Sequence, residues 1–230
     1  MRPTLMLLMA LVLPRAASSQ QSRNYPLETA QGLRLQNVVA EPATLDGKKG
    51  VRVTMTPMTP EQQNQVEPLA LIEGSEFSNG VIEAEIAGMP SSDAVQGARG
   101  FVGIAFRVQP DLRTYDAFYV RPTNGRAEDQ ERRNHATQYI SHPAWPWFRL
   151  RQESPSKYES YVDLMPNVWT KIRIEVRGDR ARLYVNDTPQ AVLIVNDVKS
   201  GANARGGVAL WIGPGTVAHF RNLTVTPAAP

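Results

Sequence analysis

The chain has 230 residues, of which 25 are lysine or arginine, 22 are aspartate or glutamate and none is cysteine. This length is sufficient for one domain with a full hydrophobic core. Without cysteine the chain has no disulfides, no thiol nucleophile and no cysteine-ligated zinc. Two arginines fall in the leader segment described next, which leaves 23 basic residues against 22 acidic ones. This near-neutral balance gives no sign of a nucleic-acid partner.

The first 19 residues have the pattern of a secretory signal peptide. Arg2 precedes an apolar run at residues 5–13 that is too short to span a membrane, and small residues occupy positions 16–19. Polar residues follow from Gln20 onward, which argues against a transmembrane anchor. We therefore expect cleavage after Ser19, a secreted or periplasmic protein and no membrane insertion. A mobile leader at residues 20–26 and a tail at 227–230 would flank a single domain at residues 27–226.

Most of the chain alternates apolar and polar residues with a period of two, which is typical of β-strands. The pattern predicts strands at residues 33–39, 50–55, 69–72, 80–86, 100–108, 115–121, 169–177, 181–186, 191–195, 206–212 and 217–225. Turn residues separate these segments, and no segment has a helical period of useful length. Many short strands without helices predict an all-β fold, a two-sheet antiparallel β-sandwich.

The last third of the chain carries a resemblance to a known superfamily. The segments WTKIRIEV (169–176), ARLYVN (181–186), GVALW (207–211) and FRNL (220–223) resemble the concanavalin A-like (laminin G-like) lectin/glucanase sandwich. Residues 77–85 and 103–107 look like the strands that precede its concave sheet. The resemblance implies a jelly roll whose site lies on that sheet. The whole chain is also similar to bacterial secreted 3-keto-disaccharide hydrolase domains, which implies a carbohydrate ligand and glycosidic cleavage.

Candidate catalytic carboxylates occur in two places. Glu83 and Glu85 share one face of a predicted strand, about 6–7 Å apart, and glycosidases use two carboxylates at roughly 5–10 Å. The glucanase run E-x-D-x-x-E is absent, so we favour the alternative that this is the polar face of an ordinary strand. Glu128 and Asp129 lie in a charged loop at residues 124–133. They are candidates for an acid or a base.

The stretch at residues 115–161 has the densest chemistry. Between positions 121 and 151 it holds six arginines against three acids. Arginine forks can bind sugar hydroxyls or carboxylates, but these charges could equally pair with one another. His135 or His142 could act as a general base. Their spacing does not suit a metal site, so we expect none. A structural calcium ion held by Asp or Asn oxygens of the loops stays open as an alternative.

The run HPAWPWF at residues 142–148 combines prolines with aromatic rings. The prolines fix an extended or turned loop, which would present Trp145 and Trp147 for stacking on a sugar. The alternative is that these rings cover an open edge of the core. We assign Trp169 and Trp211 to the core instead.

These patterns together define a candidate site on the concave sheet. In the strand at residues 100–108 the apolar residues take alternate positions, so we expect Arg107 to point away from the core. The candidate substrate-binding residues are Arg107, Tyr119, Arg121, Asn124, Arg126, Gln138, Tyr139, His142, Trp145, Trp147 and Arg149. The candidate catalytic residues are Glu128, Asp129, His135 and Glu83. The sequence thus predicts a secreted protein that binds a glycan or disaccharide and, if it is an enzyme, a glycoside hydrolase. The alternative is a non-catalytic lectin-like or protein-interaction module.

Overall fold

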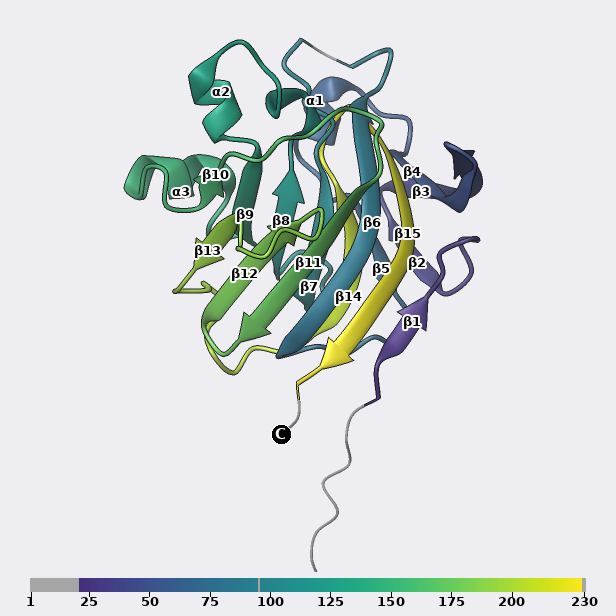
Figure 1. Cartoon of the computed structure of the whole chain (residues 1–230). Helices are drawn as coiled ribbons and strands as arrows, with labels where there is room; N and C mark the ends of the chain where they lie inside the picture. Colours follow the sequence, from purple (N-terminus) through teal and green to yellow (C-terminus); the bar gives the residue numbers. More distant parts are fainter. Residues whose placement is uncertain (1–20, 95, 229–230) are drawn as a thin grey trace, which may run out of the picture.

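The computed structural model describes residues 21–94 and 96–228 and shows two antiparallel sheets packed face to face (Figure 1). The predicted all-β fold is therefore confirmed, and the architecture is that of a concanavalin A-like jelly roll. The predicted signal peptide at residues 1–19 lies outside the described residues. In the described part of the chain, no helix combines the length and the apolar character needed to cross a membrane.

One sheet has eight strands. Their spatial order is β13 (Leu193–Val195), β12 (Arg180–Val185), β11 (Thr170–Arg177), β6 (Gly80–Pro90), β15 (Thr216–Pro227), β4 (Lys48–Met55) and β3 (Val38–Leu45), and β1 (Arg23–Tyr25) pairs with β15. As alternation predicts, Ile172, Ile174 and Val176 of β11 are buried in the core. The opposite face of this sheet carries charged side chains.

The other sheet has seven strands. Their spatial order is β10 (Glu159–Ser160), β9 (Thr137–His142), β8 (Tyr115–Val120), β7 (Val102–Val108), β14 (Gly207–Ile212), β5 (Leu69–Ile72) and β2 (Leu33–Gln36). Every residue of β7 and β8 is buried, on both faces of the sheet. Loops and short helices therefore cover the outer face of this sheet, and the eight-stranded sheet covers its core face.

The predicted strands recur in the structure, but one of them is divided, and β1, β9 and β10 were not predicted; β1 lies in the segment at residues 20–26 that was expected to be a mobile leader. The single strand expected at residues 33–39 is divided at Asn37, whose positive φ of 56° turns the chain from β2 in one sheet to β3 in the other. The second difference is β9, which falls in the central stretch where no strand was predicted. Its two neighbours, β8 and β10, enclose it in the seven-stranded sheet.

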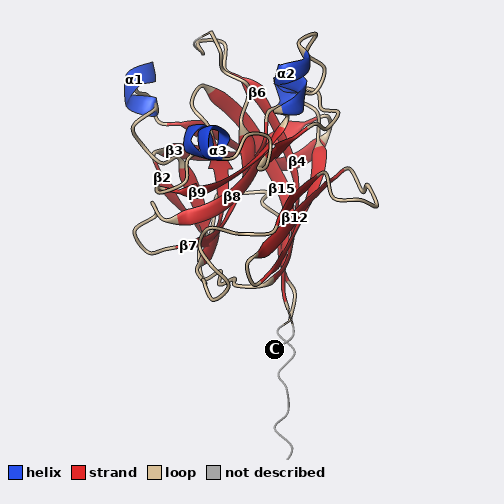
Figure 2. Ribbon diagram, turned by 90° about the vertical axis from the view of Figure 1, so that its left-hand side faces the viewer, coloured by secondary structure: helices blue, strands red, loops and turns tan. Residues whose placement is uncertain are grey.

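Three short helices interrupt the strands, although the sequence shows no helical period. They are α1 (Pro60–Gln63), α2 (Gln130–Asn134) and α3 (Trp147–Glu153), and a 3₁₀ turn, η1, spans Pro122–Asn124. Helix α3 begins at Trp147, directly after Pro146, so residues 147–148 are helical and do not belong to the extended or turned loop expected there. An ion pair between Arg149 and Glu153, at positions i and i+4, stabilises the helix. All three helices lie toward the same half of the molecule, away from the C-terminus (Figure 2).

Candidate functional site

A pocket of about 560 Å³ opens on the outer face of the seven-stranded sheet. Its volume is in the range of small-molecule sites. Strands β8, β9 and β14 supply its floor, and each of the three helices contributes to its walls. The lining residues are Gln63, Asn64, Val66, Glu67, Pro68, Gly97, Ala98, Arg99, Phe101, Tyr115, Tyr119, Arg121, Asn124, Arg132, His135, Ile140, His142, Pro146, Trp147, Phe148, Arg151, Trp211, Ile212 and Pro214.

The floor of the pocket is aromatic. The rings of Tyr119 and Trp211 stack with centroids 4.5 Å apart and planes at 23°. Gly103 lies between them in the sheet, paired with Tyr119 on one side and Trp211 on the other. A Cβ atom at Gly103 would lie 2.6 Å from the Cα and Cβ atoms of Tyr119, so a side chain there would displace the ring. The absence of a side chain at this position thus lets two rings from different strands meet.

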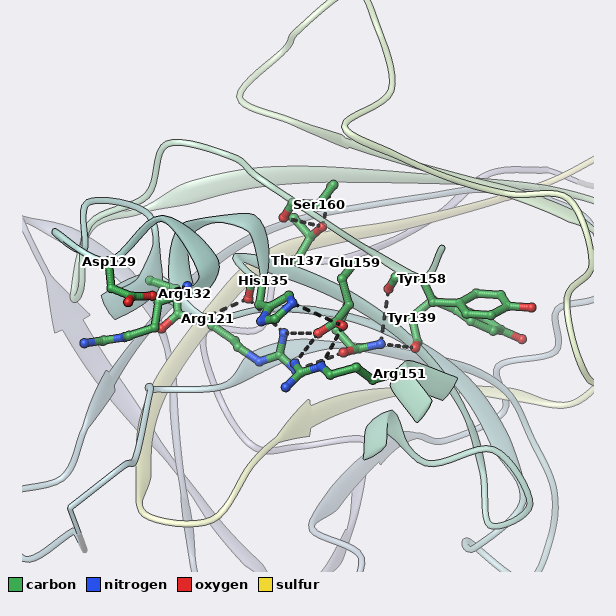
Figure 3. Close-up of polar contacts among 12 residues, drawn as sticks. Arg121, Asp129, Arg132, His135, Thr137, Tyr139, Arg151, Tyr158, Glu159 and Ser160 are labelled. Carbon is green, nitrogen blue, oxygen red and sulfur yellow. Dashed lines mark hydrogen bonds and ion pairs between the residues drawn. The ribbon is translucent and has the colours of Figure 1, made fainter. Parts of the chain in front are cut away.

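At one end of the floor, three side chains surround a buried carboxylate, Glu159 (Figure 3). Arg121 Nη1 lies 3.1 Å from Glu159 Oε1, and Arg151 Nε donates to Oε2 at 2.9 Å. His135 Nε2 is 3.7 Å from Oε2. Burial acts to raise the pKa of Glu159, but the hydrogen bond from Arg151 and the charges of both arginines outweigh it and lower the pKa. Glu159 is therefore an anion held behind the pocket wall.

His135 is the titratable group at this end that is suited to exchanging protons. It is half-buried at the C-terminus of α2, and its carbonyl oxygen accepts from Arg121 and Asn124, which fixes its position. Burial lowers the pKa of His135, and the charges of Arg151 and Arg121 lower it further against the opposing effect of Glu159. The imidazole is therefore neutral at neutral pH. Because Glu159 lies near Nε2, the proton is favoured on that nitrogen, which leaves Nδ1 as the basic atom.

A second cluster, formed by Glu67, His142 and Tyr115, lies at the other end of the floor. His142 Nε2 is 3.0 Å from Glu67 Oε1, and Nδ1 is 2.9 Å from the carbonyl oxygen of Arg113. Tyr115 donates to Glu67 and accepts from Trp211 Nε1 at 3.1 Å. Burial acts to lower the pKa of His142, but the hydrogen bond and charge of Glu67 outweigh it and raise the pKa. Both partners of the ring are acceptors, so the protonated form of His142 can donate to each of them.

The two clusters are separated by four residues of β8, from Tyr115 to Tyr119, which corresponds to roughly 14 Å along the strand. The aromatic floor fills the space between them. A flat ligand on the floor would therefore meet a neutral histidine and arginines at one end and a paired carboxylate at the other.

The structure brings about half of the predicted site residues together. Those that line the pocket are Tyr119, Arg121, Asn124, His135, His142 and Trp147. Gln138 lies directly beneath it, fully buried, and accepts from Arg121 at 2.9 Å. The remaining candidates lie elsewhere, for reasons that differ from residue to residue.

The expected orientation of Arg107 is corrected. Its φ is 56°, and the pairing with β14 shifts by one residue at this position, which is a β-bulge. The bulge reverses the alternation, so Arg107 is buried between the sheets, 4.0 Å from Asp116. Tyr139 belongs to the same interior network and donates to Asp116 Oδ1 at 2.6 Å, so it too lies off the pocket face.

The candidate carboxylates also lie outside the pocket. Glu83 is on β6, in the eight-stranded sheet, and pairs in register with Arg173 and Thr224 on the outer face of that sheet. Glu128 is exposed. Asp129 caps α2 by accepting from the backbone N–H of Arg132 at 2.7 Å. These positions correct the expectation that Glu83, Glu128 or Asp129 faces a ligand on the seven-stranded sheet.

Three further candidates are held by structural contacts away from the pocket. Arg126 is exposed and forms an ion pair with Asp163 at 2.7 Å. Trp145 is enclosed between Arg149, 3.9 Å from its ring centroid, and Lys199, at 4.7 Å. Arg126 and Arg149 therefore form ion pairs with acidic side chains of the protein, which was the alternative to ligand binding.

Sequence reasoning missed several residues that build the pocket. Glu159, Glu67 and Tyr115 were not singled out, and Trp211 was assigned to the core although it forms part of the floor. Trp169 is only half-buried, on the eight-stranded sheet, where its ring packs edge-on against His219. The local excess of arginine between positions 121 and 151 could have indicated Glu159, because buried arginines require a carboxylate and Glu159 comes soon after these arginines in the sequence.

Comparison with known families assigns the chain. Residues 37–226 match the model of the 3-keto-alpha-glucoside-1,2-lyase-like domain. The chain belongs to this family. The match covers every lining residue of the pocket and all strands of the two sheets except β1 and β2.

Solved structures confirm the fold of this family member. The carbohydrate-binding module CBM66 from Bacillus subtilis is 14% identical, with 83% of this chain and 96% of that chain covered and a TM-score of 0.53. The Crh5 transglycosylase in complex with NAG is 12% identical, with 93% and 86% covered and a TM-score of 0.54. A Bacillus subtilis protein with a galectin-like fold is 10% identical, with 89% and 94% covered and a TM-score of 0.52. At these identities the likeness concerns the fold alone.

The sequence has no match among curated proteins. Across residues 21–94 and 96–228, no three histidine, aspartate or glutamate side chains come together in a metal-binding arrangement.

Proposed function

We propose that the protein binds a 3-keto-glucoside in the pocket and cleaves it by 1,2-elimination, with His135 as the general base. One observation carries this proposal. His135 lines the pocket, its pKa is lowered by burial and by the flanking arginines, and Glu159 Oε2 lies 3.7 Å from its Nε2 atom. A base of this kind suits removal of a carbon-bound proton near neutral pH.

The chemistry follows from the ketone. A carbonyl at C3 acidifies the hydrogen on C2, and Nδ1 of His135 takes that proton. The electron pair forms the C1=C2 double bond as the bond from C1 to the glycosidic oxygen breaks. The departing oxygen takes a proton from solvent and leaves as an alcohol, so the products are an unsaturated 3-keto sugar and the free aglycone. No redox partner is required.

The arginines around His135 have a defined role in this step. Negative charge develops on the C3 oxygen as the C2 proton leaves, and donors placed at such an oxygen lower the barrier. Arg151 and Arg121 line the pocket beside His135. Their contacts with Glu159 hold the guanidinium groups in place before the substrate arrives.

The carboxylates of the pocket favour elimination over hydrolysis. Glycoside hydrolases generally use two carboxyl groups that flank the scissile bond. Among the described lining residues, Glu67 supplies the one carboxylate, and it is bonded to His142 and Tyr115. Glu159 is behind the wall and held by two arginines. An elimination needs one base and an anion-stabilising group, which this pocket has.

Sugar binding is assigned to the floor. The stacked rings of Tyr119 and Trp211 offer a flat apolar surface for the CH face of a pyranose. Trp147 and Phe148 stand at the rim with 44% and 59% of their surface exposed. We further propose, from the N-terminal sequence, that the protein is exported and acts outside the cytoplasm.

The test uses a 3-keto-disaccharide and its unmodified parent, each incubated with the purified protein. We expect cleavage of the keto form alone and a transient conjugated enone as the first product, seen by ultraviolet absorbance and, in mass spectrometry, by a mass one water below that of the hydrolysed keto sugar. His135→Gln should lower the cleavage rate by about 10²–10⁴-fold while binding persists.

Two results would contradict this proposal. A hydrated keto sugar as the first product, formed without a conjugated enone before it, would show hydrolysis. Binding of both sugars without any cleavage would show a lectin-like binding module, which the aromatic floor alone could support.

A further inference from the structure

The pocket has more positive charge than its carboxylates balance. Four arginines line it: Arg99, Arg121, Arg132 and Arg151. Two of them, Arg121 and Arg151, share Glu159. The lining carboxylate, Glu67, belongs to the cluster at the opposite end of the floor.

Arg99 and Arg132 have no carboxylate partner among the residues that the structure describes. The guanidinium of Arg99 donates through Nη1 to the carbonyl of the preceding residue, Ala98, at 3.1 Å. Arg132 makes two long contacts through Nη2, at 3.4 Å to Thr123 O and 3.5 Å to Asn124 Oδ1. Its Nε atom is buried and has no hydrogen-bond partner. Both guanidinium groups therefore keep donors that the protein does not use.

These two arginines converge on one short segment. The backbone N–H of Thr123 donates to the carbonyl of Arg99 at 3.5 Å, and Arg132 reaches the carbonyl of the same Thr123. Burial lowers the pKa of Arg99, and the charges of Arg132 and Arg121 lower it further. Arg99 and Arg132 therefore lie near each other and near Arg121, which is already paired with Glu159, and an anion between the two unpaired guanidinium groups would stabilise this end of the pocket.

Nearby acids do not supply that anion. The carboxylate of Asp129 caps α2, and Glu131 on the same helix is exposed. In Figure 3 the guanidinium groups of Arg121 and Arg151 surround Glu159, whereas Arg132 lies beside Asp129 outside this group. Neither acid forms an ion pair with Arg132 in the described part of the chain.

We propose that Arg99 and Arg132 bind an oxyanion carried by the sugar itself, so that the preferred substrate is an acidic sugar such as a hexuronic acid derivative. Guanidinium forks recognise carboxylate and phosphate groups through paired hydrogen bonds. This inference deepens the proposed function, on which it rests, by naming the substrate class of the same site.

The position of the pair also explains how an anion would help the reaction. Arg132 lies on α2 and His135 is the C-cap residue of that helix, and both side chains line the pocket. An anionic group held by Arg132 places the rest of the sugar beside His135 and over Tyr119. The anion site therefore acts in positioning, not in the chemical step.

The first experiment measures binding without chemistry. Glucuronate, glucose 6-phosphate and glucose are titrated into the protein at low and high salt, with calorimetry as the readout. We expect an anionic sugar to bind at least tenfold more tightly than glucose, with the preference shrinking in high salt. A preference for glucuronate identifies a carboxylate ligand, and a preference for glucose 6-phosphate identifies a phosphate ligand and overturns the uronic-acid assignment.

Variants of the two arginines test where the anionic group binds. Arg99→Gln and Arg132→Gln, alone and together, should each reduce the preference for the anionic sugar and leave glucose binding unchanged. Arg126→Gln is the matched control, because this exposed arginine pairs with Asp163 outside the pocket. Thermal melting checks that each variant is folded. Equal binding of charged and neutral sugars, or a preference that survives in the folded double variant, would overturn the inference.

A second experiment separates this inference from the proposed function. The 3-keto forms of an acidic and a neutral disaccharide are compared as substrates of the wild-type protein. Equal cleavage of the two would reject the acidic-sugar preference and leave elimination standing. An anion preference in binding without cleavage of either would reject elimination and leave the anion site standing.

Discussion

Two buried arginine–carboxylate networks in the described part of the chain have the same residue types but different surroundings. Arg107 and Asp116 lie between the sheets, and both side chains have no exposed surface. Arg121 and Glu159 lie under the pocket, with 6% and 2% of their side chains exposed. Burial alone therefore does not separate them.

The interior network is closed. Arg107 donates to the carbonyl oxygens of Ser78, Gly178 and Gly201, at 3.0, 2.8 and 2.9 Å. It thus joins three turns that are far apart in the sequence. Asp116 in turn accepts from Tyr139 and Ser200. The guanidinium donors of Arg107 thus bind acceptors inside the protein, and this network is not arranged to bind a ligand.

The network under the pocket is satisfied on one side and open on the other. Arg121 donates to Gln138 and to the carbonyl of His135 within the protein. The His135 and Arg151 side chains on its other side line the pocket. A perturbed pKa and a buried charge thus mark a functional site only where a ligand can reach one member of the network.

The largest expected effect is on the interior network. Arg107→Met leaves Asp116 buried without its cation, which should lower the free energy of unfolding by about 3–5 kcal/mol. Urea denaturation followed by tryptophan fluorescence measures this. A folded variant whose stability matches that of the wild type would break the distinction between the two networks.

The next effect is on catalysis. Glu159→Gln removes the charge that fixes the tautomer of His135, so kcat/KM for a 3-keto-glucoside should fall by about 100-fold, at the low end of what general-base catalysis contributes. Arg121 keeps Gln138 and two further acceptors, so the variant should stay folded. Unfolding curves give the control. Unchanged kcat/KM would show that the pocket network is structural, like the interior one.

The rim of the pocket provides a smaller test. Trp147 covers the open network, since the guanidinium of Arg151 lies 4.8 Å from its ring centroid. Trp147→Ala should weaken sugar binding by about 1 kcal/mol through the loss of aromatic contact. Trp169→Ala, on the other sheet, is the matched control and should bind like the wild type. Calorimetry distinguishes the two variants, and equal losses would place the sugar elsewhere.

The pH dependence of cleavage sharpens the role of His135. Protonated imidazole cannot accept a proton, so the rate should rise with pH through the pKa of His135. Burial and the adjacent arginines lower that pKa below the ordinary value of 6.5. The midpoint of the rate profile should therefore lie on the acidic side of 6.5, and a midpoint above it would point to a different base.

The smallest effect concerns the stability contributed by His142. Its pKa is raised in the folded protein, where Glu67 outweighs the effect of burial, so its contribution is fully present below the unfolded pKa of about 6.5. That contribution is lost as pH rises through the folded pKa. The difference in unfolding free energy between the wild type and His142→Gln should accordingly shrink as pH increases above 6.5. A difference that does not change with pH would show that the pair is not ionised.

The fold could be predicted from the sequence because alternation is a local property. Ile172, Ile174 and Val176 face the core where the period of two places them. The same rule failed at Arg107 because one bulged residue reverses every expectation about its side chain. No local pattern distinguishes a bulge from a regular strand.

The site was predicted in part, for a related reason. The arginines, His135 and Trp147 stand out by composition in one stretch of chain. Glu67 and Trp211 join them only through the sheet, from segments on either side of that stretch. Contacts between distant strands decide which side chains share a pocket, and a period of two does not contain that information.

Gly103 shows how a missing side chain can be a feature of the site. In a central strand, glycine gives up packing and weakens the strand, so it usually marks a place where something else must approach. Here the approaching groups are the rings of Tyr119 and Trp211, which stack on each other above Gly103. The smoothness of the pocket floor is therefore encoded by a residue that no ligand would touch. A Gly103→Ala change would place the new Cβ atom 2.2 Å from the carbonyl oxygen of Phe118 and 2.6 Å from Cα of Tyr119, so β8 would have to shift and carry the ring of Tyr119 out of the floor.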